Sequence, residues 1–222
     1  MASNVGMLWL DDMSLRHLQE FHQMRTDKEA ARLSDDTVSE SMEESKARLE
    51  AHIAELNDSW TDSYVMKKAI VVDRGNSGFK TVGFIYTTGP TPQGLGLRFE
   101  MLSQWRRHFY CTQGLLKFFE MYHDTFTQRR APVEKAFDIE DDIWHARAAG
   151  DDGKVPVQHL VCSIPMENKG AYAVAWKLKG VPRLSERSGH YIFYFERKID
   201  DPEEKTWAEM APEILKNLRR TK

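Results

Sequence analysis

The sequence predicts a mixed α/β fold, in which strand-like and helix-like segments alternate along the chain. Some segments are rich in Val and Ile or have an apolar residue at every second position, as in strands. Others have apolar residues every three to four positions, as in helices. A chain of 222 residues with 41% hydrophobic content is also long enough for one well-buried core. We therefore expect a single domain over residues 1–200 and a helical tail over residues 201–222.

The central segment, residues 97–126, has the pattern of a strand, a loop and a helix. Apolar and polar residues alternate from Leu97 to Met101, and apolar residues recur at helical spacing from Leu115 to Phe126. The loop from Gln104 to Thr112 contains two arginines and a histidine just before the helix begins. Since backbone N–H groups and the positive end of the helix dipole attract anions, this loop is the main candidate for an anion site.

A short strand, two helices and a strand hairpin are expected before this segment. Asp11 or Asp12 can cap the first helix, and Ser41 with Glu44 has the spacing of a capping box for the second. Gly89–Gly96, with two prolines and three glycines, is expected to be a loop. The predicted elements cover residues 6–10, 13–24, 39–56, 64–73 and 81–87.

After the central helix, residues 128–154 form a long polar and acidic segment that contains Trp144 and His145. It is either a lid over a substrate or a solvated loop. A buried strand over residues 157–164, a helix over residues 168–180 and a closing strand over residues 190–197 follow. Apolar residues at helical spacing predict that the tail docks on the core or on a second copy of the chain, as in a homodimer.

Composition excludes several classes of function. A net charge of −3 and a pI near 6.3 give no general attraction to nucleic acid or to anionic membranes. Cys111 and Cys162 have no metal-ligand spacing, so we expect no metal. Two cysteines also suit a reducing cytosol, and the N-terminus has no basic region followed by an apolar run. The protein is expected to be cytoplasmic and to act on a small molecule.

Two short motifs resemble those of the GNAT acetyltransferase superfamily, in its branch that acetylates ribosomal proteins and small amines. In that family a loop of pattern Q/R-x-x-G-x-G/A binds the pyrophosphate of coenzyme A. Gln104 matches its first position, but the two small positions fall on Arg107 and Phe109. Asn168 and Gly180 match the last motif of the family. The resemblance implies a twisted, mostly antiparallel sheet with helices on both faces.

The resemblance also implies acetyl-CoA or another acyl-CoA as cofactor. The residues that it places at the cofactor are Leu102, Gln104, Arg106, Arg107, His108, Phe109, Tyr110, Cys111 and Asn168. Glu100 lies where GNAT enzymes often have a carboxylate base, and His108 and His190 are the other candidates.

The acid of the family is missing from its usual positions. Trp176 stands where a tyrosine is common, and Ala171 where a serine is sometimes used. An indole cannot donate a proton to a thiolate, which leaves Tyr172 as a candidate acid. Cys111 beside His108 is an alternative nucleophile.

Three functions remain open at this point. The first is acyl transfer from acyl-CoA to an amine or hydroxyl of a small molecule. The second is a GNAT-fold enzyme of specialised metabolism that no longer uses acyl-CoA and catalyses decarboxylation, elimination or cyclisation. The third is a non-catalytic binding protein. The degenerate positions, Arg107, Phe109, Ala171 and Trp176, favour the second and the third.

Overall fold

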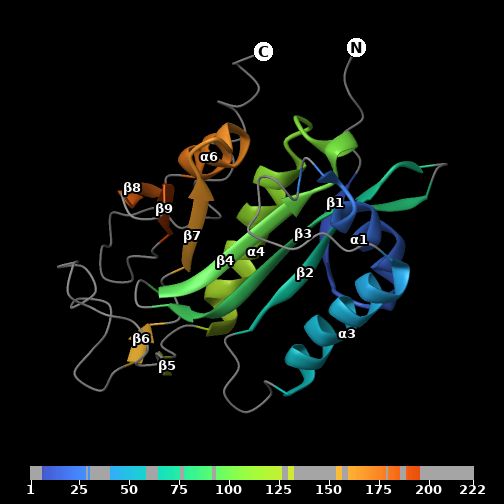
Figure 1. Ribbon diagram of the computed structural model, residues 1–222, viewed down its shortest axis with the longest axis horizontal. Coiled ribbons are helices and arrows are strands. Elements are labelled where there is room, and N and C mark those ends of the chain that lie inside the picture. The colour runs from blue at the N-terminus through green and yellow to red at the C-terminus, as the bar shows by residue number, and fades with distance from the viewer. Residues whose placement is uncertain are drawn as a thin grey trace. The chain divides into compact units, whose positions relative to one another are not determined.

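The computed structural model describes residues 7–28, 30, 41–58, 65–75, 78–91, 94–126, 130–132, 154–156, 160–178, 180–185 and 189–195. The chain divides into two compact units. Unit 1 comprises Met1–Tyr86 and Phe99–Phe118, and unit 2 comprises Thr87–Arg98 and Phe119–Lys222. Strands β3 and β4 and helix α4 run through both units (Figure 1). The prediction of a single domain over residues 1–200 stays a prediction.

Unit 1 is built on three antiparallel strands. Strand β1 pairs with β2, and β2 pairs with β3 through a register that joins Lys67 to Tyr86 and shifts between Ile70 and Val71. The elements that lie wholly or partly in this unit are β1 (Leu8–Asp12), η1 (Leu15–His17), α1 (Leu18–Arg25), α3 (Met42–Asp58), β2 (Lys67–Asp73), β3 (Phe79–Thr91), β4 (Gly94–Met101), η3 (Ser103–Trp105) and α4 (Tyr110–Phe126).

Helices cover both faces of these strands, as predicted. On one face, α1 and α3 bury a cluster that includes Phe21, Leu49, Val71 and Phe84. On the other face, Gly114 of α4 lies against the sheet, where an added Cβ would come within 2.9 Å of the Ile70 side chain. Successive side chains of a strand point to opposite faces of the sheet. Since helices cover both faces, the apolar side chains of β2 are buried on each of them.

The second helix begins with the capping box that the sequence predicts. The Glu44 amide donates a hydrogen bond to Ser41 Oγ at 3.1 Å, and the Ser41 amide donates to Glu44 Oε2 at 3.3 Å. These two bonds satisfy backbone donors that have no partner inside the helix. The helix therefore begins at Met42, and residues 39–40 lie outside the described residues.

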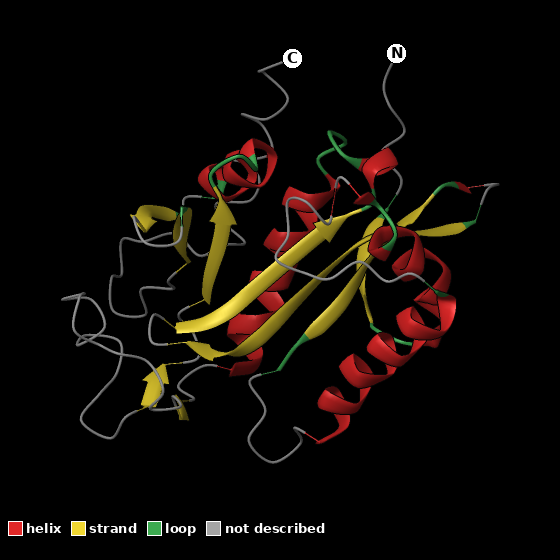
Figure 2. Ribbon diagram, viewed as in Figure 1, coloured by secondary structure: helices red, strands yellow, loops and turns green. Residues whose placement is uncertain are grey.

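Unit 2 contains a second group of strands (Figure 2). Strand β9 pairs antiparallel with β7 and with β8, while β4 pairs parallel with β7 at Leu95↔Leu160 and Gly96↔Val161. The hydrogen-bonded strand order is β1-β2-β3-β4-β7-β9-β8, with β5-β6 as a separate pair. The elements that lie wholly in this unit are β5 (Arg130–Pro132), β6 (Lys154–Pro156), β7 (Leu160–Pro165), α6 (Lys169–Lys177), β8 (Val181–Ser185) and β9 (His190–Phe195).

Gly180 has a steric role beside β9. A Cβ at this position would lie 2.7 Å from a ring carbon of Phe195 and 2.9 Å from one of Phe193. The residue that matched the last family motif is therefore needed for packing. Among the described residues, no helix is both long enough and apolar enough to cross a membrane.

Several predicted boundaries were wrong. Residues 89–91 continue strand β3, and β4 already begins at Gly94, so the loop expected over Gly89–Gly96 is much shorter. The first helix starts with a 3-10 turn at Leu15, and strand β8 was missed. Turn-forming residues mark where a chain can bend, whereas pairing with neighbouring strands decides where it does. The tail and most of the segment 128–154 lie outside the described residues.

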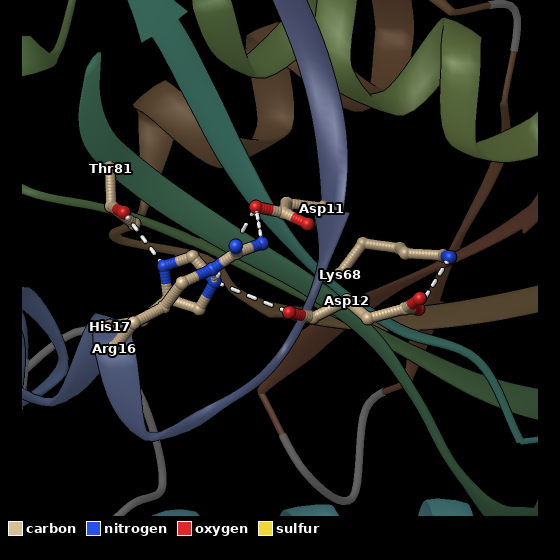
Figure 3. Close-up of polar contacts among 6 residues, drawn as sticks. All are labelled: Asp11, Asp12, Arg16, His17, Lys68 and Thr81. Atoms are coloured by element: carbon tan, nitrogen blue, oxygen red, sulfur yellow. Dashed lines mark hydrogen bonds and ion pairs between the residues drawn. The ribbon is translucent and has the colours of Figure 1, made fainter. Parts of the chain in front are cut away.

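A buried histidine joins β1 to β3 in unit 1 (Figure 3). His17 Nδ1 lies 3.0 Å from Thr81 Oγ1, and Nε2 lies 3.2 Å from the Asp12 carbonyl oxygen. Arg16 Nε lies 3.3 Å from Nε2 as well, so both ring nitrogens of His17 have polar partners. The ion pair Arg16–Asp11 lies beside the ring, and Lys68 pairs with the Asp12 side chain on the side away from it (Figure 3).

Acid is expected to weaken the fold through His17. Burial, helped by the Arg16 charge, lowers the pKa of His17 against smaller opposing effects of the Asp12 carbonyl and Glu20. Below about pH 6.5 the unfolded chain therefore binds a proton that the folded chain does not, and stability falls until the folded pKa is passed. The fall is measured as the free energy of unfolding in urea at a series of pH values between 7.5 and 5.

The informative comparison is with His17→Gln. The variant is less stable than the wild type at pH 7.5, and the difference in unfolding free energy narrows as the pH falls. A difference between wild type and His17→Gln that is constant with pH would contradict this role of the imidazole.

Candidate functional site

The loop between β4 and α4 has an unusual backbone. Arg107 has φ of 67° and Phe109 has φ of 63°, and they are the only non-glycine residues with positive φ in the described part of the chain. Side chains with a Cβ avoid this left-handed region, at a cost of about 1–3 kcal/mol per residue. These are the two positions at which the GNAT pattern has a small residue. The backbone at both positions therefore has a conformation that suits glycine, although both residues carry large side chains.

Two contacts hold this loop to the end of α1. Gln23 Nε2 donates a hydrogen bond to Gln104 Oε1 at 3.1 Å, and Arg106 Nη2 lies 3.7 Å from Asp27 Oδ2. The Asp27 carboxylate thus offsets part of the Arg106 charge. The exposed Arg107 retains its charge at the loop surface.

Aromatic side chains of the loop pack on one another. The rings of His108 and Tyr110 stack with centroids 5.8 Å apart, and both centroids lie 6.1 Å from that of Trp105. The Arg74 guanidinium lies 5.0 Å from the centre of the Trp105 ring, in cation–π contact. The loop surface is therefore formed by stacked rings and a cation.

The helix that follows supplies a positive dipole end. Helix α4 begins at Tyr110, and the Gln113 amide already donates to the Phe109 carbonyl at 3.0 Å. Leu102, by contrast, is buried in the core, and its amide bonds to the Val82 carbonyl at 3.1 Å. Its carbonyl accepts a hydrogen bond from the Trp105 amide at 2.9 Å, so both backbone polar groups of Leu102 are bonded within the protein.

The two cysteines differ in environment. Cys111 is half-buried in the first turn of α4, near the positive end of the helix dipole. Cys162 on β7 is buried, and burial raises its pKa to about 12. A thiol with that pKa stays protonated near neutral pH and is not a nucleophile.

Glu100, the predicted base, lies half-buried near the end of β4. Tyr86 of β3 donates a hydrogen bond from its hydroxyl to Glu100 Oε1 at 2.7 Å. Unit 1 thus contains both the carboxylate and the candidate anion loop, since Glu100 and residues 102–111 all belong to it. A hydrogen bond to the charged carboxylate favours its ionised form, which a base requires.

The other predicted site residues belong to unit 2. Asn168 Oδ1 accepts a hydrogen bond from the Ala171 amide at 3.1 Å and so caps α6. The Tyr172 ring packs edge-on against Tyr191 and Phe193 and stacks on Trp176. His190 starts strand β9 opposite Pro165 and Ser185. Asn168 and Tyr172 therefore have structural contacts of their own.

Sequence reasoning missed the polar neighbours of Glu100. Tyr86 and Lys67 lie side by side on β3 and β2, and Lys67 Nζ contacts His52 Nδ1 of α3 at 2.8 Å. The sequence held no signal that favours Lys67 over Lys68, because the apolar residues of β2 are buried on both faces of the sheet. No group of three metal-ligating side chains occurs among the described residues.

Comparison with known proteins gives a fold but no sequence relative. No family model and no curated protein matches the sequence. Among solved structures, the ribosomal L7/L12 α-N-protein acetyltransferase RimL in complex with coenzyme A is 15% identical. It matches over 90% of this chain and 98% of its own, with a TM-score of 0.58.

Two further structures show the same likeness. The spermidine N-acetyltransferase from Vibrio cholerae in complex with CoA and spermine is 9% identical, over 84% of this chain and 92% of its own, with a TM-score of 0.56. The microcin C7 self-immunity acetyltransferase MccE in complex with acetyl-CoA and AMP is 10% identical. It matches over 88% of this chain and 98% of its own, with a TM-score of 0.58. The chain therefore has the GNAT fold, which confirms the fold predicted from its motifs.

Proposed function

We propose that this protein transfers an acyl group from an acyl-CoA to an amine or hydroxyl of a small molecule, with Glu100 as general base. The observation that carries the proposal is the left-handed backbone at Arg107 and Phe109. A chain that had no further use for this loop shape would gain stability by relaxing it. The bound molecules of the three similar structures, CoA or acetyl-CoA in each, agree with the proposal.

The loop residues fit the pyrophosphate of an acyl-CoA. The left-handed backbone at Arg107 and Phe109 turns the loop just before α4, and the free N–H groups and dipole at the start of that helix attract an anion. The exposed Arg107 guanidinium supplies a positive charge beside this backbone, since Arg106 is paired with Asp27. The side chain that departs from the family pattern thus adds charge.

Glu100 performs the proton transfer in this proposal. An acyl-CoA supplies an activated thioester, and the acceptor amine attacks only in its neutral form. The ionised Glu100 carboxylate takes the proton of the acceptor ammonium, directly or through a water. A dedicated acid is not essential, because a thiol has a pKa near 8.5 and leaves readily as the thiolate. The lack of a tyrosine at Trp176 therefore does not oppose acyl transfer.

A second candidate is an enzyme on the same fold that converts a metabolite without acyl-CoA, by decarboxylation, elimination or cyclisation. The packing of Trp105, His108 and Tyr110 favours it, because these rings fill part of the loop surface with protein side chains. A non-catalytic binding protein would show the same packing. Both alternatives predict that acyl-CoA does not bind.

Calorimetric titration with acetyl-CoA and with free CoA tests the proposal. Dissociation constants between about 1 µM and 1 mM are expected for both, the usual range for substrates. Pantetheine, which lacks the pyrophosphate, is the control and should bind far more weakly because the loop contacts the phosphates. Absence of heat at millimolar CoA, with the protein shown to be folded, would leave only the two alternatives.

A further inference from the structure

A row of polar side chains crosses three strands on the face that α1 and α3 cover. Lys67 of β2 pairs directly with Tyr86 of β3, and the Tyr86 hydroxyl donates to Glu100 of β4 at 2.7 Å. Lys67 is 2% exposed and Tyr86 5% exposed. Their neighbours on this face are apolar, including Ala69 of β2. Lys67 and Tyr86 therefore lie inside a hydrophobic core, and Glu100 lies half-buried at the end of the row.

Helix α3, which packs on this face of the sheet, contributes two further polar side chains. Lys67 Nζ donates to His52 Nδ1 at 2.8 Å and forms an ion pair with Glu55. His52 and Glu55 are three residues apart, so they lie on the same face of the helix. The His52 ring also lies against Tyr86, with centroids 5.1 Å apart. The Tyr86 ring is thus held between the sheet and α3.

Such a group is costly to bury. An ammonium or a phenol loses its hydration in a core and regains the loss only through well-placed partners. Apolar residues of similar size would pack at these positions with comparable stability. The buried Tyr86 hydroxyl, which donates to the Glu100 carboxylate, is therefore better explained by what it does to Glu100 than by its contribution to folding.

We infer that Tyr86 is a positioning residue for Glu100, held in place by Lys67 and His52. Its hydroxyl fixes the orientation of the carboxylate and stabilises the ionised form that accepts the acceptor's proton. Tyr86 keeps its own proton throughout, and the proton lost by the acceptor ammonium goes to Glu100. This inference rests on the proposed function for its role in catalysis, although the hydrogen bond itself can be tested in the resting protein.

The test is the titration of the Glu100 carboxyl, followed by ¹³C NMR in wild type and in Tyr86→Phe, with Glu100→Gln to assign the signal. Removing the hydroxyl takes a hydrogen bond from the charged form, so the Glu100 midpoint is expected to rise by about one pH unit. Tyr191→Phe, on β9, is the control and leaves the midpoint unchanged. An unchanged midpoint in folded Tyr86→Phe overturns the inference.

Steady-state kinetics with acetyl-CoA and a panel of amines supply the second measurement. Tyr86→Phe is expected to lower kcat about tenfold while the KM for acetyl-CoA is unchanged, because the tyrosine acts on the base alone. A rise in KM with constant kcat would overturn the positioning role. A wild type that neither binds nor turns over acetyl-CoA refutes the proposed function, and the NMR titration still decides whether Tyr86 controls Glu100.

Discussion

Glu100→Gln lowers kcat/KM for acyl transfer by about 10²–10⁴-fold, the range expected when a general base is lost. Glutamine has nearly the same shape and still accepts the Tyr86 hydrogen bond through its carbonyl oxygen. It cannot take a proton from an ammonium near neutral pH. The loss should therefore fall on kcat, with the affinity for acetyl-CoA unchanged in calorimetry.

A second glutamate provides the control for this substitution. Glu50 is exposed on α3 and lies 3.8 Å from Lys46, so Glu50→Gln removes a carboxylate without touching the site. Its kcat/KM should equal that of the wild type. Full activity in Glu100→Gln would reject Glu100 as the base while leaving acyl transfer itself open. Loss of acetyl-CoA binding in that variant would instead mean that Glu100 has a structural role.

Arg107→Gly is expected to stabilise the fold by about 1 kcal/mol. The left-handed conformation costs a residue with a Cβ about 1–2 kcal/mol, and the greater freedom of glycine in the unfolded chain offsets part of the gain. Arg107 is exposed, so little packing is lost. For a chain of this length the change corresponds to a rise in Tm of roughly 2–4 °C in a thermal unfolding experiment.

His108→Gly is the matched control, because it lies between the two strained residues and has no positive φ. Glycine there gains no conformational relief and should lower Tm. In acetyl-CoA titrations Arg107→Gly is expected to bind more weakly, since it removes the charge beside the anion site. If Arg107→Gly lowers Tm as much as His108→Gly does, the left-handed backbone at Arg107 is not a source of strain.

The sequence predicted much of the local structure because local rules govern it. The alternation before Met101 and the helical spacing after Leu115 placed β4 and α4, and the spacing of Ser41 and Glu44 placed the start of α3. Gln104 marked the loop between β4 and α4. Each of these depends on residues close together in the chain, so that a pattern of a few positions is enough.

The loop shape and the surroundings of Glu100 depend on tertiary structure. The residue types of Arg107 and Phe109 do not indicate a conformation suited to glycine. The contacts of Gln104 and Arg106 with the end of α1 hold this loop. Likewise, β2 is apolar on both faces, so its pattern does not show which lysine is buried.

By itself, then, the sequence determined the order of most elements, though not strands β5, β6 and β8, together with the GNAT resemblance and the position of a carboxylate on β4. Only the tertiary structure placed Lys67 beside Tyr86 and Tyr86 beside Glu100, through a register that shifts at Ile70 and Val71. Side chains from three strands meet only when that register is fixed, and register is set by packing between residues far apart in the chain.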